Sequence, residues 1–325
     1  MSKVFLLLII LSSVVSAQKT FAVDDFSDRY FGRVYISDTE SVFSEGWVAI
    51  YDKKTKKQLI KIKSSELSFS LKDGEIVSNI KELPYGEQSQ IMYEDLNFDG
   101  KKDFALMDGQ NSCYHGPSFQ IYLATASGFS HSPAFTRLAQ DYCGMFDVDH
   151  SKKKITTMTK SGCCWHQVAE FRVVNNRPLA FKIVEEQLNP NGLQVDYVEL
   201  NRVSGKMKRS GYSHFESGDL GNAIFYTVRF ANNKVMRLVD QSGSLFYVFT
   251  DSNDKVELVY SGDFVYSLSE NTLTFRSGNV TYQINNDGIS IRSPKQNLKL
   301  KTVVGTSTGS FSELRSAKFE NVSQK

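Results

Sequence analysis

Apolar and polar residues alternate with a period of two along most of this chain, a pattern that predicts strands rather than helices. In its first part, strands are expected at residues 47–51, 59–63, 67–71, 104–107, 119–123, 155–158, 165–174, 179–188 and 195–200. Asp73-Gly74 supplies the positive φ of a tight turn, and Asn175-Asn176 joins the strands on either side of it. The pattern therefore predicts an all-β protein.

A break and a polar stretch divide the expected strands into two groups. Asn189-Pro190-Asn191-Gly192 interrupts the first group, and a polar stretch rich in Gly and Ser runs from Ser204 to Asn222. Beyond it, strands are expected at residues 225–230, 235–239, 245–250, 256–260, 272–276, 280–284 and 289–291. Such a meander is compatible with a small barrel or sandwich. The capping-box spacing from Ser310 to Glu313 predicts a short C-terminal helix. We expect domains at residues 18–200 and 201–325.

The N-terminus has the three parts of a secretory signal peptide. Met1-Ser2-Lys3 is positively charged, residues 4–11 are apolar, and Val15-Ser16-Ala17 ends in a small residue. The apolar run is far shorter than the ~20 residues of a membrane-spanning helix. We expect a signal peptide at residues 1–17, cleaved after Ala17, with an uncleaved signal anchor as the alternative. The mature chain is then periplasmic or secreted, with no membrane span.

The charge balance excludes one class of partner. The chain has 38 Lys and Arg against 36 Asp and Glu, a formal net charge of +2. It therefore has no strong overall positive field that would attract nucleic acid. Its hydrophobic content of 41%, with 23 Phe and 15 Tyr, is enough for substantial cores. We therefore expect a folded protein that does not bind nucleic acid.

Residues 95–103 read D-x-N-x-D-G-x-x-D, the ligand spacing of a calcium-binding loop. Oxygen-bearing side chains recur at every second position, and a hard cation takes about six to eight oxygen ligands. The expected metal ligands are Asp95, Asn97, Asp99, the backbone carbonyl of Lys101, and Asp103. Leu106 stands where helix-loop-helix sites have Glu, and a strand is expected at that point. We therefore expect a Ca²⁺ loop in a β-sandwich or propeller-like domain, followed by a smaller antiparallel β domain. An ordinary acidic β-turn is the alternative.

An even number of cysteines in an exported chain predicts disulfides. The four are Cys113, Cys143, Cys163 and Cys164. Neighbouring residues on a strand point to opposite faces, so we expect one of Cys163 and Cys164 to bond Cys113 and the other to bond Cys143. A Cys163–Cys164 bridge together with a Cys113–Cys143 bridge is the alternative.

The chain offers little that predicts a catalytic site. It contains no H-E-x-x-H motif and no phosphate-binding glycine loop, and its acidic cluster is assigned to the metal. Two polar loops fixed by cysteines instead indicate partner binding, because rigid loops lose little entropy on docking. Their candidate contact residues are Tyr114, His115, Ser161, Gly162, Trp165 and His166, with a core position as the alternative for Trp165. We therefore expect a non-catalytic binding protein.

Several segments between Val34 and Glu186 carry a family resemblance. They are the 95–103 loop with the strand after it, the strand at 119–123, Phe146-Asp147-Val148-Asp149 and the Ser161-Gly162 loop. Together they resemble bacterial periplasmic immunity proteins against lysozyme-like effectors, a family similar to the periplasmic inhibitors of invertebrate-type lysozyme. The resemblance implies an all-β fold, bound calcium, no catalysis, and a loop inserted into a glycan-cleaving active site. The inhibitors carry Ser-Gly-x-x-Tyr, whereas this chain has Trp165 at the Tyr position. Residues 273–282 weakly resemble the closing hairpin of small β-barrel lysozyme inhibitors.

These observations favour one function over two others. We expect an inhibitor or immunity protein whose partner is a peptidoglycan hydrolase. A structural or adhesive module of the cell envelope is the alternative, because the same loop spacing occurs in repeat domains of surface proteins. Only one clear copy of the loop is present here. A hydrolase with an unrecognised site, using His115 or His166 as the base, is the third hypothesis.

Overall fold

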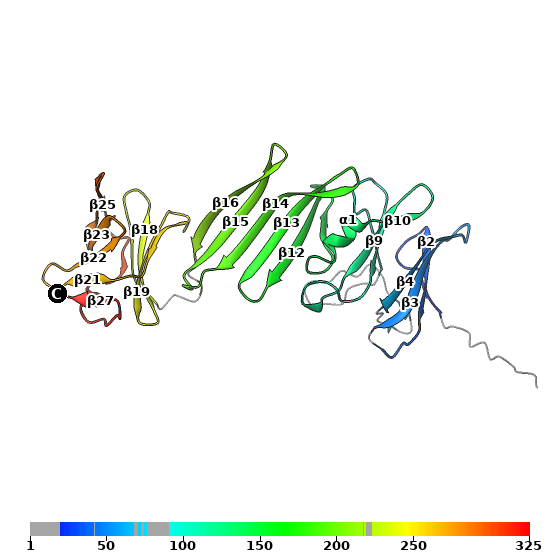
Figure 1. Ribbon diagram of the computed structural model, residues 1–325, viewed down its shortest axis with the longest axis horizontal. Helices are drawn as coiled ribbons and strands as arrows, with labels where there is room; N and C mark the ends of the chain where they lie inside the picture. The colour runs from blue at the N-terminus through cyan, green and yellow to red at the C-terminus, as the bar shows by residue number, and fades with distance from the viewer. Residues whose placement is uncertain are drawn as a thin grey trace, which may run out of the picture. The chain divides into compact units, whose positions relative to one another are not determined.

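The computed structural model describes residues 20–41, 43–67, 71–72, 75–76, 91–216, 218 and 223–325. The expected signal peptide and the Asp73-Gly74 turn lie outside these residues. Almost all regular structure is β, which confirms the predicted fold class (Figure 1). The chain divides into two compact units, one formed by Met1–Lys160 and Val168–Phe181, the other by Ser161–Gln167 and Lys182–Lys325.

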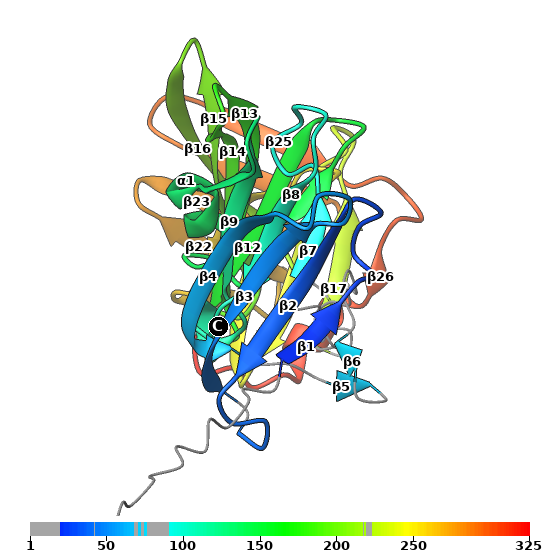
Figure 2. The ribbon, with the colours of Figure 1, turned by 90° about the vertical axis from the view of Figure 1, so that its right-hand side faces the viewer.

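The first unit contains two four-stranded antiparallel sheets. One has the order β1 (Thr20–Val23), β2 (Tyr30–Ile36), β3 (Ser44–Asp52) and β4 (Gln58–Leu67), side by side in Figure 2. The other has the order β10 (Phe129–His131), β9 (Phe119–Ala124), β8 (Asp103–Met107) and β7 (Ile91–Glu94). The same unit also contains the pair β5 (Leu71–Lys72) and β6 (Glu75–Ile76), the 3-10 turn η1 (Cys113–His115), helix α1 (Pro133–Leu138), and part of a six-stranded sheet described below.

An apolar core joins these two sheets. Val34 and Val48 are partners across β2 and β3, and both are buried. They belong to the same cluster as Phe104 of β8. The Phe104 ring centroid lies 4.6 Å from that of Phe129 and 5.2 Å from that of Phe26. This packing fixes the start of β8, where Asp103 of the predicted calcium loop is located.

Gly46 lies where β3 approaches β2 closely. A Cβ at this position would lie 2.1 Å from the carbonyl oxygen of Tyr35 and 2.8 Å from Cδ1 of Leu67. Gly46→Ala is therefore expected to lower the free energy of unfolding by about 2 kcal/mol through steric strain, as measured by urea denaturation. Gly211→Ala is the control, because its Cβ would make an ordinary 3.5 Å contact with the carbonyl oxygen of Tyr197. Equal losses in the two variants would contradict this account.

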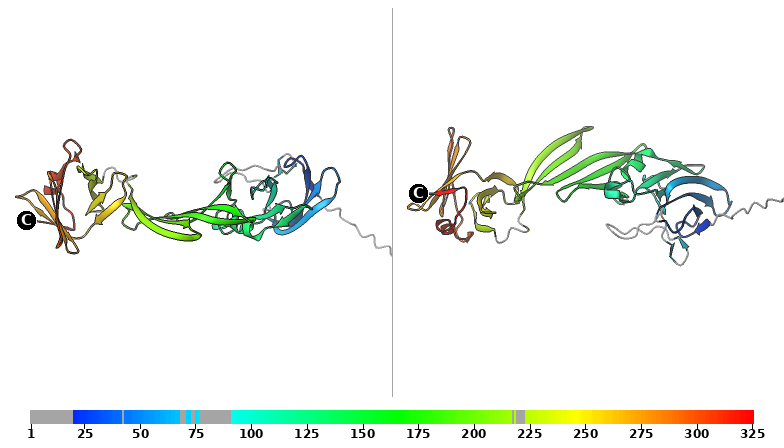
Figure 3. Two further views of the ribbon diagram at one scale, coloured as in Figure 1. Left: turned by 90° about the horizontal axis from the view of Figure 1, so that it is seen from above. Right: turned by 60° about the horizontal axis from the view of Figure 1, so that its bottom comes forward.

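Six strands form a further sheet. Its order is β11 (Asp147–Asp149), β12 (Lys154–Ser161), β13 (Trp165–Val174), β14 (Arg177–Leu188), β15 (Gln194–Val203) and β16 (Lys206–Phe215). Strand β13 has the predicted bounds, and Asn175 and Asn176 turn the chain with φ values of 50° and 55°. No residue of β14 or β15 is fully buried, and these strands form a single layer (green in Figure 3).

Two features of this sheet differ from the sequence-based expectation. Residues 200 and 201, where the two expected domains meet, lie inside β15. Strand β16 lies within the polar stretch 204–222, where no strand was expected. Five of its ten residues are exposed and only Phe215 is buried, so its sequence lacks the apolar alternation that marks a half-buried strand.

The rest of the second unit contains two sheets and a 3-10 helix. One sheet has the order β20 (Val256–Tyr260), β19 (Ser244–Thr250), β18 (Val235–Gln241), β17 (Ile224–Arg229) and β26 (Thr308–Gly309). The other has the order β25 (Asn297–Lys301), β24 (Gly288–Arg292), β23 (Val280–Asn285), β22 (Thr272–Ser277), β21 (Phe264–Ser267) and β27 (Val322–Gln324). The 3-10 helix η2 (Phe311–Arg315) occupies the position of the expected C-terminal helix. Among the described residues, no helix is long and apolar enough to span a membrane.

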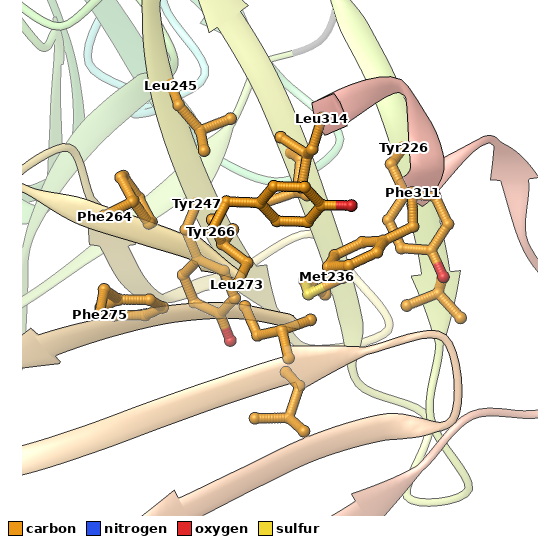
Figure 4. Close-up of a cluster of buried hydrophobic side chains, with 14 of the residues drawn as sticks. Tyr226, Met236, Leu245, Tyr247, Phe264, Tyr266, Leu273, Phe275, Phe311 and Leu314 are labelled. Carbon is orange, nitrogen blue, oxygen red and sulfur yellow. The ribbon is translucent and has the colours of Figure 1, made fainter. Parts of the chain in front are cut away.

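One aromatic-rich cluster fills the space between these two sheets (Figure 4). Tyr247 of β19 and Phe275 of β22 come from different sheets, and their ring centroids lie 4.8 Å apart. Tyr266 of β21 and Phe311 of η2 extend the cluster, with ring centroids 6.3 Å apart. The second unit thus has its own hydrophobic core.

Candidate functional site

The predicted calcium loop connects β7 to β8 in the first unit. It begins after Glu94 and ends with Asp103, the first residue of β8. Two residues in the left-handed region curl the loop, Phe98 with φ 62° and Gly100 with φ 86°. No atom lies within 4 Å of the position of a Gly100 Cβ, so glycine is favoured here by its backbone conformation rather than by lack of space.

The side-chain oxygens of the loop turn toward its own backbone amides. The N–H of Asp99 donates to Oδ1 of Asp95 and to Oδ1 of Asn97, each at 3.1 Å. The N–H of Gly100 donates to Oδ2 of Asp95 at 2.9 Å, and that of Lys101 donates to Oδ1 of Asp99 at 2.8 Å. Because Asp95 and Asn97 accept from one nitrogen, their oxygens lie on the same side of the loop.

Asp103 is the buried member of the set, with 0% of its surface exposed. Its Oδ2 accepts the N–H of Leu96 at 2.9 Å, and its Oδ1 accepts that of Ala124 at 2.7 Å. Burial raises the pKa of this carboxyl to about 6, the two backbone donors oppose that shift, and the charges of Asp99 and Asp95 add to it. The three carboxylates therefore lie within each other's electrostatic field, which a cation would neutralise.

The donor chemistry of the loop fits Ca²⁺. Carboxylate, amide and carbonyl oxygens are the ligands that this hard cation prefers. Three or more His, Cys, Asp or Glu side chains arranged to hold a metal do not occur among the described residues.

Two contacts connect the loop region to other parts of the first unit. The Nδ2 of Asn97 donates to Oδ1 of Asn176 at 3.3 Å, in the turn between β13 and β14. Oε1 of Glu94, at the end of β7, lies 2.8 Å from Nε2 of His150, whose ring also contacts that of Phe98 edge-on. Sequence patterns did not reveal these partners, because the contacts join residues that lie 56 and 79 positions apart.

All four cysteines form disulfides, as predicted, but the favoured pairing was wrong. Cys113 bonds Cys143, and Cys163 bonds its neighbour Cys164. The favoured pairing assumed that Cys163 and Cys164 lie on a strand and point to opposite faces. They lie instead in the turn between β12 and β13, where the alternation of faces does not apply.

The first group of candidate contact residues forms an exposed loop of the first unit. Tyr114 and His115 follow Cys113 and have φ values of 52° and 56°. Two successive non-glycine residues in the left-handed region of φ and ψ are uncommon and strained. The Cys113–Cys143 bridge anchors the loop, and its backbone is closed by a 2.9 Å hydrogen bond from Gly116 N–H to the carbonyl of Cys113. Tyr114 is 61% exposed.

The second group forms the tip of the β12–β13 hairpin in the second unit. Ser161, Gly162 and Cys163 are exposed, and Trp165 is half-buried, so Trp165 is not a core residue. The N–H of Leu188 donates to the carbonyl of Cys164 at 2.9 Å. His166 Nδ1 lies 3.1 Å from Oε1 of Glu186. The six candidate contact residues therefore fall into two groups, one in each unit.

One further string resembles a catalytic motif. Residues 305–309 read G-x-S-x-G, the spacing of a nucleophile elbow, which needs a strand–turn–helix context. Here the string runs into the two-residue strand β26. The string therefore lacks the strand–turn–helix context of that motif.

Comparisons with known proteins leave the family open. No family model and no curated protein matches the chain. It is similar to a Xanthomonas protein described as Type IV secretion system related, with 18% identity over 61% of this chain and 96% of that one, at a TM-score of 0.49. It is also similar to TolB from Acinetobacter baumannii, with 11% identity over 87% of this chain and 66% of that one, at 0.23. An uncharacterised Listeria monocytogenes protein shares 9% identity over 87% of this chain and 82% of that one, at 0.25. We base no functional assignment on similarities this low.

Proposed function

We propose that this protein is an exported, calcium-stabilised, non-catalytic β-protein that binds and blocks a peptidoglycan hydrolase. Two disulfides, Cys113–Cys143 and Cys163–Cys164, support an oxidising compartment outside the cytoplasm. The oxygen-rich loop at residues 95–103 supports a bound Ca²⁺. Asp95, Asn97, Asp99, the carbonyl of Lys101 and Asp103 would hold the ion, which would neutralise their mutual repulsion.

The observation that carries the proposal is the exposed tip of the β12–β13 hairpin. Ser161, Gly162 and Cys163 are exposed, and the Cys163–Cys164 bridge restrains the turn. A tip that is rigid before binding loses little conformational entropy when it enters a partner's cleft. Small side chains at its end fit a narrow active site. The half-buried Trp165 next to the tip supplies an aromatic group at the rim of the contact.

The family resemblance adds a target class to this geometry. In the lysozyme inhibitors that the chain resembles, a Ser-Gly loop is expected to enter a glycan-cleaving active site. Ser161-Gly162 occupies the corresponding place in this sequence, and Trp165 replaces the Tyr of that motif. The replacement distinguishes this tip from the motif of the invertebrate-type inhibitors, so the target class comes from the Ser-Gly loop rather than from Trp165.

Inhibition kinetics test the proposal. The mature chain, with Ca²⁺ present, is expected to slow at least one member of a panel of lysozyme-type hydrolases in a saturable manner. Ser161→Arg places a bulky cation at the tip and is expected to raise the inhibition constant at least about 30-fold, the effect of losing an interface hot spot. Ser252→Arg, at the exposed turn between β19 and β20, is the matched control and should leave inhibition unchanged.

Two results would count against the proposal. One is that no enzyme of the panel is slowed. The other is that the Ser161 and Ser252 variants lose inhibition equally, since the contact would then not involve the hairpin tip. Binding to cell-envelope glycan without inhibition would favour an adhesive module instead.

A further inference from the structure

Strand β16 is an edge of the six-stranded sheet, and five of its ten residues are exposed. It pairs with β15 from Lys206 to Phe215, and the sheet order ends with it. Asp254 and Lys255 contact the outer side of β16 at the C-terminal end of this strand. There His214 and Lys255 form an isolated antiparallel β-bridge, and the N–H of Phe215 donates to the carbonyl of Asp254 at 2.8 Å. Along residues 206–213, the described part of the chain supplies no outer strand. Alternate backbone N–H and C=O groups of an edge strand point outward and can pair with an added strand.

The free part of this edge carries a concentration of positive charge. Lys206, Lys208 and Arg209 are all exposed. None of the ion pairs among the described residues involves them. Side chains alternate between the faces of a strand, so Lys206 and Lys208 lie on one face and Arg209 on the other. Cations therefore border the open backbone on both faces of the sheet.

We propose that residues 206–213 of β16 bind an extended acidic segment of another protein as an added strand. Main-chain hydrogen bonds to the open edge would hold the segment, and Asp or Glu side chains at neighbouring positions would meet the cations on the two faces. This surface differs from the hairpin tip, because β16 lies three strands away from β13 in the sheet order. The proposal therefore stands whether or not the tip binds a hydrolase.

Charge disfavours two other occupants of this edge. A second copy of β16 would bring a second set of the same cations beside Lys206, Lys208 and Arg209, and facing like charges destabilise a strand pair. A polyanion such as nucleic acid needs a broad basic surface. Here the neighbouring strand β15 carries a single cation, Arg202 opposite Met207, and two acidic residues, Asp196 and Glu199 opposite Ser213 and Ser210 of β16, so the positive surface does not broaden across β15.

Fluorescence anisotropy with a labelled peptide tests the proposal on the mature chain. The probe is a peptide of about eight residues with the repeat Glu-Glu-Val-Val, which places Glu on both faces and matches the length of the open edge. Saturable binding is expected for this peptide and none for a Lys-Lys-Val-Val peptide of the same length. The triple variant K206E/K208E/R209E is expected to bind the acidic peptide at least about tenfold more weakly. The control R292E/K295E/K299E reverses three exposed cations of the β24–β25 hairpin and should bind within about twofold of the unchanged chain.

Proline substitutions test whether the contact is a strand pairing. Neighbouring residues direct their N–H groups to opposite sides of a strand, so one of Ser210→Pro and Gly211→Pro removes an outward N–H and leaves the pairing with β15 intact. That variant, identified by an unchanged melting temperature, is expected to lose peptide binding at least about tenfold.

Several outcomes would overturn the proposal. One is that the acidic peptide shows no saturable binding up to about 1 mM. Another is that the basic peptide binds as tightly as the acidic one, and a third is that the two triple variants lose affinity for the acidic peptide equally. Retention of binding by the proline variant that melts normally would exclude an added strand. Competition by a DNA oligonucleotide of equal charge would reassign the strip to polyanion binding.

Discussion

Asp103→Ala is expected to lower the free energy of unfolding by about 4 kcal/mol in the presence of a calcium chelator. The carboxylate is fully buried and accepts the N–H groups of Leu96 and Ala124. Each buried donor that loses its acceptor costs about 1–3 kcal/mol, and bonds to a charged acceptor are stronger than neutral ones. Urea denaturation at neutral pH measures the loss.

A conservative variant separates hydrogen bonding from charge at this position. Asp103→Asn keeps the side-chain volume and one acceptor oxygen, so about half of the loss is expected, roughly 2 kcal/mol. Asp287→Ala, on an exposed turn of the second unit, is the control and should unfold like the unchanged chain. If Asp103→Ala cost less than about 1 kcal/mol, the two backbone donors would have to find other acceptors, and Asp103 would not be structural.

Removing calcium is expected to have an effect of similar size. A ligand that binds only the folded state stabilises it by mass action, by about 4 kcal/mol when its free concentration is 1,000 times the dissociation constant. Chelation should therefore lower the urea midpoint, and Asp99→Ala should remove most of the difference between the calcium and chelator curves. Calorimetric titration of the chelated chain with Ca²⁺ measures the binding directly.

The same controls make this second result interpretable. Asp287→Ala should keep the full calcium dependence, because it lies outside the loop. Overlapping unfolding curves with and without chelator, together with no heat of titration, would leave residues 95–103 as an acidic turn that binds no cation. In that case the loss expected for Asp103→Ala would persist, because it depends on two backbone N–H groups rather than on a metal.

Much of the fold follows from local sequence. Strand β13 and the Asn175-Asn176 turn have the predicted positions because apolar alternation and turn-forming residues are local signals. The curled loop at residues 95–103 also has a local signal, since Gly100 adopts the left-handed conformation that its position in the motif requires.

The errors share a physical origin, because they depend on surroundings that the local pattern does not encode. The favoured disulfide pairing depended on whether Cys163 and Cys164 lie on a strand or in a turn. Strand β16 has few buried residues, so its burial pattern carries no period of two. The candidate site shows the same limit, since the contact of Asn97 with Asn176 joins distant parts of the sequence.

The two disulfides differ in how strongly they restrict the unfolded chain. The Cys113–Cys143 bond joins residues 30 positions apart, and closing such a loop is worth about 3–4 kcal/mol by restricting the denatured ensemble. The Cys163–Cys164 bond joins residues with a separation of 1 and closes no such loop. A thiol reductant that reaches this exposed turn can therefore reduce the Cys163–Cys164 bond without raising the conformational entropy of the unfolded chain appreciably. The hairpin tip can then be reduced to two thiols while the protein stays folded.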